Sequence, residues 1–148
     1  ISMSTTPYSI EDFKFFRKML EYREQPTTRK FAIVDSEKDI KNTEGAVKYC
    51  EMNKLDYELI PSMERVDFLR KLAEYPALVF LPKTPESCCR LVTEARILGL
   101  NVITPPTYGA PHEEWFKLSG VSLVDELERI TLEESLPTIK QYISRGIK

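Results

Sequence analysis

The chain has few of the residues that build disulfide or metal-held scaffolds. Its 148 residues include three cysteines and one histidine. The cysteines, Cys50, Cys88 and Cys89, are odd in number, and the two that are adjacent rarely bridge because the closed ring is strained. One histidine and no C-x2-C pair give no basis for a zinc site. This cysteine usage fits a reducing compartment, so we expect a cytoplasmic protein.

The chain also lacks long apolar runs, a dominant charge and glycine-rich loops. No apolar run approaches the roughly 18–20 residues of a transmembrane helix, so no membrane span is predicted. Lys and Arg number 21 against 23 Asp and Glu, and this balance argues against a broad nucleic-acid-binding surface. No G-x-G-x-x-G follows a strand pattern, which argues against a dinucleotide-dependent dehydrogenase. A hydrophobic fraction of 42% is ordinary and predicts a folded domain.

Helix and strand patterns alternate along the sequence. An N-terminal amphipathic stretch has Ser9 as its N-cap and Asp12 three residues on, which is typical of a capping box. Apolar runs predict four strands at 30–35, 56–60, 77–81 and 101–104. Helical patterns cover 8–24, 42–54, 66–75, 86–98 (closed by Gly99), 113–118, 122–129 and 133–144.

This alternation predicts the fold class. Strand–helix repetition gives an α/β, Rossmann-like three-layer domain with a parallel sheet of at least four strands. We divide the chain into an N-terminal helix and linker, 1–27, and the Rossmann-like domain, 28–148. Ligands of such sheets bind outside the carboxyl ends of the strands, so the loops there are the first place to look for a site.

The loop after the third predicted strand carries the chemistry. Glu86 falls in the first turn of the following helix, whose free N–H groups attract anions, phosphates above all. Glu94 follows eight residues later, roughly 12 Å along the axis and about 80° beyond two full turns. Both carboxylates can therefore line one side of a cleft, at a spacing like that between sugar and ribose in a nucleotide-sugar. A carboxylate suits a vicinal diol because it accepts two hydrogen bonds.

The Pro-Glu-(seven residues)-Glu-Ala pattern, set between an apolar strand and Gly99, resembles the E-x7-E signature of retaining GT-B glycosyltransferases. It resembles their C-terminal, donor-binding half, and the likeness covers roughly residues 28–130. The resemblance implies that Glu86 contacts the transferred sugar and is the catalytic contact, that Glu94 binds the ribose, and that Lys41 contacts the donor phosphates. It further implies a diphosphate cradle formed by Cys88, Cys89, Arg90 and Leu91.

Each of these residues also has a plainer interpretation. The helix dipole favours a glutamate such as Glu86 in any first turn. Glu94 is placed to pair with Arg90, four residues before it, on a solvated face. Arg90 is then a pairing residue rather than a phosphate contact. Lys41 is equally consistent with an ordinary surface lysine. Cys88 and Cys89 are equally consistent with small residues of the core or of a pocket wall.

The resemblance implies a function for half of an enzyme. We expect a domain that binds a nucleoside-diphosphate sugar, with no metal or other cofactor, as part of a retaining glycosyltransferase that acts on a glycan, lipid or protein acceptor. An N-terminal acceptor-binding domain is the missing partner, and this half alone is expected to be inactive. The first residue, Ile1, fits a cut from a longer chain. The alternative is a flavodoxin- or receiver-like α/β interaction domain with no catalytic role.

Overall fold

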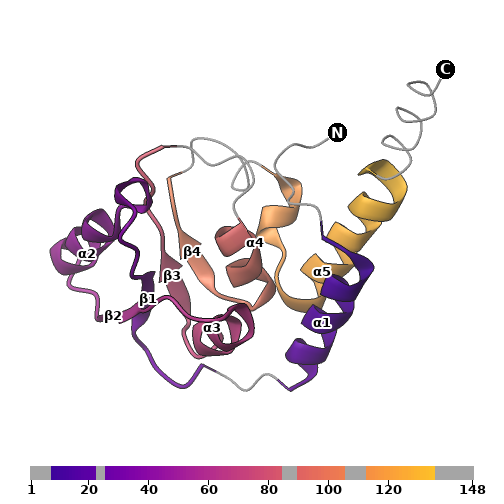
Figure 1. The fold of residues 1–148 in the computed structure, drawn as a ribbon, viewed down its shortest axis with the longest axis horizontal. Coiled ribbons are helices and arrows are strands. Elements are labelled where there is room, and N and C mark those ends of the chain that lie inside the picture. Colours follow the sequence, from indigo (N-terminus) through magenta and orange to yellow (C-terminus); the bar gives the residue numbers. More distant parts are fainter. Residues whose placement is uncertain (1–7, 23–25, 85–89, 106–112, 136–148) are drawn as a thin grey trace.

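The protein folds around a small parallel sheet (Figure 1). The structure is a computed structural model, and it describes residues 8–22, 26–84, 90–105 and 113–135. The strands run in the order β2-β1-β3-β4, and every neighbouring pair is parallel. Their bounds are β1 Phe31–Val34, β2 Tyr57–Ile60, β3 Ala77–Val79 and β4 Asn101–Ile103. The predicted four-stranded parallel sheet and Rossmann-like class are thereby confirmed.

Helices follow the strands in the predicted alternation. The N-terminal helix precedes β1, one helix follows each of the first three strands, and the last helix comes after β4. Their bounds are α1 Ile10–Glu21, α2 Thr43–Met52, α3 Arg65–Leu72, α4 Arg90–Ile97 and α5 Gly120–Arg129. Short 3₁₀ turns span Asp39–Lys41 and Glu114–Lys117, and a π-helical turn continues α5 over Ile130–Ser135.

The two faces of the sheet are covered unequally. On one face α2 packs Ala46 and Cys50 against Ile33 and Val79. On the other face α3 and α4 pack against the sheet, and the larger core there also takes in α1 and α5. The sheet therefore forms the middle layer between helices, and α1 and α5 lie side by side beyond α4 (Figure 1).

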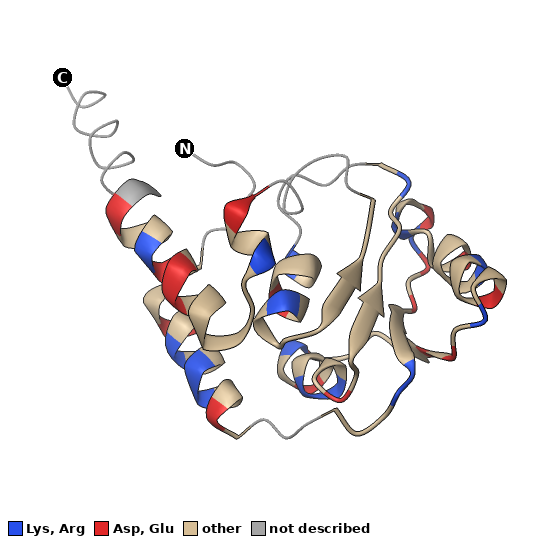
Figure 2. Ribbon diagram, turned by 180° about the vertical axis from the view of Figure 1, so that it is seen from behind, with Lys and Arg blue, Asp and Glu red and all other residues tan. Residues whose placement is uncertain are grey.

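Polar contacts as well as apolar packing join α1 to α5. Arg17 of α1 pairs with Asp125 at 2.8 Å and with Glu128, both on α5. Figure 2 shows residues of both charge signs along these two helices. Beneath the ion pairs, Phe13 and Phe16 of α1 are fully buried in the larger core. The N-terminal helix is thus an integral part of this core.

The chain sets the helix ends through local chemistry. Ser9 and Asp12 form the expected capping box of α1: the Ser9 hydroxyl accepts from the Asp12 N–H at 3.1 Å, and Asp12 accepts from the Ser9 N–H at 2.9 Å. Gly99 takes φ 86°, and Leu100 N–H bonds back to the Ala95 carbonyl. This left-handed C-cap ends α4 and turns the chain into β4.

Some expectations are refined by the structure. Met52 belongs to the helical pattern predicted at 42–54, and the sequence favours it as part of a partial apolar stripe, but its side chain is 83% exposed at the last residue of α2. The segment 113–118 is a 3₁₀ turn rather than an α-helix, although its Trp115 is buried. Residues 136–144 of the last predicted helix and the start of the helix at 86 lie outside the described residues. Within the described part of the chain, no helix combines the length and apolarity that a membrane crossing requires.

Candidate functional site

A cavity of about 230 Å³ opens at the carboxyl edge of the sheet between β1 and β3. These two strands are adjacent although β2 comes between them in the sequence, so this is the point where the strand order reverses. Ligands of open α/β sheets bind at such switch points because the loops after the two strands diverge to opposite faces. The cavity is lined by Ile33, Val34, Ser36, Lys41, Thr43, Ala46, Val79, Phe80 and Leu91.

The loop from β1 to α2 shapes one wall of this cavity. The Thr43 hydroxyl donates to the Val34 carbonyl at 3.0 Å and accepts from the Ser36 N–H at 3.1 Å. Asn42 precedes it in the left-handed region, at φ 57°, and caps α2 by accepting from the Gly45 N–H at 3.1 Å. Side-chain bonds thus replace the missing backbone partners at the start of α2 and fix the loop against the end of β1.

A second set of contacts ties the same loop to the chain that leaves β3. Asn42 Nδ2 donates to the Leu81 carbonyl at 2.9 Å, and the Lys83 N–H donates to the Ile40 carbonyl, also at 2.9 Å. Lys83 Nζ pairs with Asp39 Oδ1 at 2.6 Å. The two loops that diverge at the switch point are therefore held together at the edge of the cavity.

The cavity is apolar in its walls and cationic at its rim. Aliphatic side chains and Phe80 form most of the lining, while Ser36 and Thr43 supply hydroxyls. Lys41 Nζ lies 5.6 Å from the centre of the Phe80 ring, a cation–π arrangement that keeps its charge beside the cavity. Helix α2 begins at Thr43, so the positive end of its dipole also faces this space. A small anionic group with an apolar neighbour is the ligand that such a lining suits.

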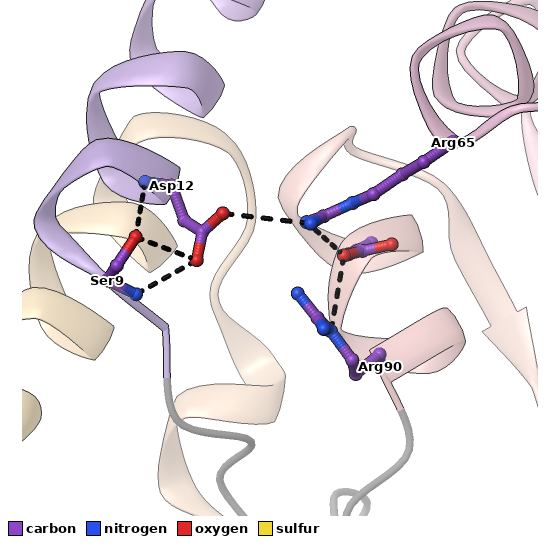
Figure 3. A network of polar contacts seen from close by, with 5 residues as sticks. Ser9, Asp12, Arg65 and Arg90 are labelled. Carbon is purple, nitrogen blue, oxygen red and sulfur yellow. Dashed lines mark hydrogen bonds and ion pairs between the residues drawn. The ribbon is translucent and has the colours of Figure 1, made fainter.

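A separate cluster of charges lies where the N-terminal ends of α1, α3 and α4 meet. Glu94 of α4 is only 6% exposed, and its Oε1 accepts a hydrogen bond from Arg65 Nη2 of α3 at 2.8 Å. Arg90 Nε lies 3.8 Å from the same oxygen. Figure 3 shows Arg65 reaching from α3 toward Asp12 of α1, 3.7 Å away. The cluster therefore joins three helices through two carboxylates and two guanidinium groups.

Burial and charge act in opposite directions on the acids of this cluster. Burial raises the pKa of Glu94, and the attraction of Arg65 and Arg90 offsets the rise only in part. Burial works against ionisation of Asp12 too, but hydrogen bonds from Ser9 and the charge of Arg65 outweigh it and lower the pKa of that carboxyl. Burial, with the neighbouring Glu94 carboxylate, raises the pKa of Tyr8, so the phenol stays protonated.

The structure brings some of the predicted site residues together. Lys41 and Leu91 line the same cavity, and their roles as phosphate contacts stay predictions. Arg90 and Glu94 belong to the charged cluster, and the i,i+4 pair foreseen between them is present. Glu94 of this pair is buried, however, while the Arg90 side chain is 47% exposed. Their proposed ligand roles stay predictions. Glu86, Cys88 and Cys89 lie outside the described residues.

Sequence reasoning did not identify several residues that build the site. Asn42 and Thr43 had a detectable signal, since Asn followed by a helical pattern is a common N-cap. Arg65 had none, because it is 29 residues from Glu94 and belongs to another helix. Among the described residues, no three His, Cys, Asp or Glu side chains are grouped so that they could hold a metal ion.

Comparison of the chain with protein-family models, with curated proteins and with solved structures gives no match. What the domain binds is therefore inferred from its own residues and geometry.

Proposed function

We propose that the domain binds a nucleoside-diphosphate sugar at the carboxyl edge of its sheet, as the donor-binding half of a retaining glycosyltransferase. The observation that carries this proposal is the cavity at the switch point between β1 and β3, with Lys41 and the start of α2 at its rim. The E-x7-E resemblance supports it, because Lys41 and Leu91, two residues that the resemblance assigns to the phosphates, line that one cavity.

The size of the cavity indicates how much of the donor it holds. Sites for whole drug-sized ligands measure about 300–1,000 Å³. A cavity of about 230 Å³ suits the diphosphate with part of the sugar, and the nucleoside would then extend along the edge of the sheet. Glu94 is three residues from Leu91 on α4, so the two residues lie on one side of that helix, and the proposal takes Glu94 as the ribose contact.

In this proposal each part has a simple chemical task. Lys41 and the positive end of α2 stabilise the diphosphate, which is also the leaving group of sugar transfer. The apolar walls of Ile33, Val79 and Phe80 exclude water around it. The acceptor and the remaining contacts at the reacting carbon come from a partner domain. The isolated chain is therefore expected to bind nucleotide and to transfer no sugar.

Isothermal titration calorimetry of the chain with UDP, GDP, ADP and their sugars tests the proposal. We expect one of these series to bind, and Lys41→Met to weaken its binding about tenfold or more through the lost charge-assisted contact. Lys48→Met is the matched control, because Lys48 lies on the exposed side of α2, paired with Glu44 at 2.9 Å. If the wild-type chain bound none of these nucleotides, or if Lys41→Met bound as tightly as wild type, the donor-binding function would be wrong.

The strand order supports a second candidate. The order β2-β1-β3-β4 is also that of flavodoxin-like sheets, which include interaction domains without catalytic activity. A chain that binds no nucleotide in the calorimetry would favour this candidate.

A further inference from the structure

The walls of the cavity at the switch point have little capacity to bind a hydroxyl group. Six of the nine described residues around the cavity carry apolar side chains, namely Ile33, Val34, Ala46, Val79, Phe80 and Leu91. Aliphatic and aromatic walls offer a ligand van der Waals contact but accept no ordinary hydrogen bond and donate none. A polar ligand atom that lies against them therefore loses the bonds that it makes in water.

The two hydroxyls of the lining are largely engaged within the protein. Thr43 donates its hydrogen to the Val34 carbonyl, and its oxygen accepts from the Ser36 N–H. The Ser36 hydroxyl accepts from the Lys38 N–H at 3.2 Å. A hydroxyl has one hydrogen and two lone pairs, so Thr43 has one lone pair left for a ligand. These side chains thus serve mainly to fix the loop from β1 to α2.

The main chain at the ends of the strands is engaged as well. Backbone N–H groups are among the polar groups that orient ligands in protein pockets. Here the Asp35 N–H donates to the Ile60 carbonyl at 2.9 Å, and the Phe80 N–H donates to the Ile103 carbonyl, also at 2.9 Å. Polar recognition is therefore concentrated at the rim, at Lys41 and the start of α2, and the interior of the cavity is apolar.

The two ends of a bound donor sugar would meet these different surroundings. Carbon C1 of the sugar carries the diphosphate, which the proposed function places beside Lys41 at the rim. The opposite side of the pyranose ring, which carries C4 and the C6 arm, then points away from the rim toward the apolar walls. In an ordinary hexose the C6 arm ends in a hydroxyl, and a buried hydroxyl without a partner weakens binding.

We propose that the donor sugar is a 6-deoxyhexose, whose C6 methyl group packs against the walls formed by Ile33, Val79 and Phe80. This inference rests on the proposed donor-binding function and deepens it, because it names the class of sugar. A hexose and its 6-deoxy form differ by a single oxygen atom, so the volume of the cavity does not decide between them. The chemistry of the walls does, since they suit a methyl group and leave a hydroxyl unpaired.

Paired sugars that differ in this one oxygen atom test the proposal. The probes are UDP-glucose with UDP-6-deoxyglucose, GDP-mannose with GDP-6-deoxymannose, and ADP-glucose with ADP-6-deoxyglucose, each titrated into the chain in a calorimeter. For the nucleotide that binds, we expect the 6-deoxy form to bind about 10-fold more tightly, the effect of one buried hydroxyl without a partner. The two sugars of a pair share base, diphosphate and ring, so the contacts of those parts cancel in the ratio.

Val79→Thr changes the wall at one point with almost no change in volume. The new hydroxyl offers a partner to the C6 hydroxyl of a hexose, so the affinity ratio should fall toward one. Val102→Thr is the matched control, because Val102 lies on the neighbouring strand β4 and packs against the larger core on the other face of the sheet. It should keep the wild-type ratio. Each ratio compares two ligands on one variant, so a lower fraction of folded protein does not alter it.

The outcomes separate this inference from the proposed function. If a hexose form binds as tightly as its 6-deoxy form, or more tightly, the choice of sugar is refuted and donor binding stands. An unchanged preference in Val79→Thr also refutes it, because the walls would not set the preference. If a nucleoside diphosphate binds and neither sugar of its pair does, the cavity is not a sugar site and the inference is likewise refuted. If wild type binds no nucleotide at all, the donor-binding function fails, and the choice of sugar fails with it.

Discussion

Gly45 offers a test of how tightly the wall of the cavity is built. A glycine in the first turn of a helix is normally a weak point, and its replacement by alanine gains up to about 1 kcal/mol of helix propensity. At this position a Cβ would come within 2.2 Å of Asn42 Nδ2 and 2.7 Å of both Cγ and Oδ1. The Asn42 side chain would have to leave, and the helix cap and the bond to the Leu81 carbonyl would be lost with it.

The magnitude follows from the bonds at stake. An N-cap is worth about 1 kcal/mol, and the hydrogen bond to Leu81 contributes about 1 kcal/mol more. We therefore expect Gly45→Ala to lower the free energy of unfolding by about 1 kcal/mol despite its better propensity. In an Asn42→Gly background the clash is absent and φ 57° is easily adopted, so the same change should raise the free energy of unfolding by up to about 1 kcal/mol.

Wild type, the two single variants and the double variant form a double-mutant cycle. Their urea unfolding can be followed by circular dichroism and by the fluorescence of Trp115, the one tryptophan of the chain, which is buried. The expected coupling between positions 42 and 45 is about 2 kcal/mol. Gly120→Ala serves as the control: Gly120 has φ +61° but open space around its Cβ position, so its cost should be the same in both backgrounds. A stabilising Gly45→Ala in wild type, or additive effects within about 0.5 kcal/mol, would refute the reasoning.

Three further predictions concern α1. Ser9→Ala should lower the free energy of unfolding by about 1 kcal/mol through loss of the N-cap. The pKa of Asp12 is lower in the folded state than in the unfolded state, where it is about 3.9. The ionised carboxyl therefore stabilises the folded state above that pH, and this stabilisation is lost as the pH falls through the folded-state pKa. Asp12→Asn should thus flatten the stability–pH profile on that acid side, and an unchanged profile would contradict the capping role. Arg17→Met should lower the free energy of unfolding by about 0.5 kcal/mol at low salt and by almost nothing in 1 M salt. The reason is that the ion pairs of Arg17 with Asp125 and Glu128 are partly exposed and therefore screened by salt. Urea midpoints measured at both salt concentrations test this.

The sequence contained enough information for the order and class of the main elements. Apolar runs such as 77–81 are too short for helices and too continuous for exposed strands, so they indicate a sheet covered on both faces. Ser9, Asp12 and Gly99 mark helix ends by chemistry that acts within a few residues, and all three do so in the structure. The exposure of Met52 could not be predicted in this way, because a periodic apolar pattern does not reveal where the covered part of a helix ends.

The candidate site was predictable only in part, because its contacts are not local. Lys41 and Leu91 line the same cavity because β1 and β3 are neighbouring strands. The sequence of neither segment indicates that strand order. Arg65 pairs with Glu94 across two helices. The plainer interpretation of Glu94 foresaw its pairing with Arg90 but not its burial, which depends on how α1 and α3 pack beside α4.

The ion pairs between α1 and α5 join segments 108 residues apart, which has a consequence for the order of folding. Chains are synthesised at about 5–20 residues per second, so α1 is made roughly 5–20 seconds before the helix it packs against. During that interval Phe13 and Phe16 have no α5 to cover them. Contacts between such distant segments form late because closing the long loop costs entropy first. The apolar face of the N-terminal helix is thus uncovered by α5 for that interval, and a chaperone that binds apolar segments could protect it while the rest of the domain is being made.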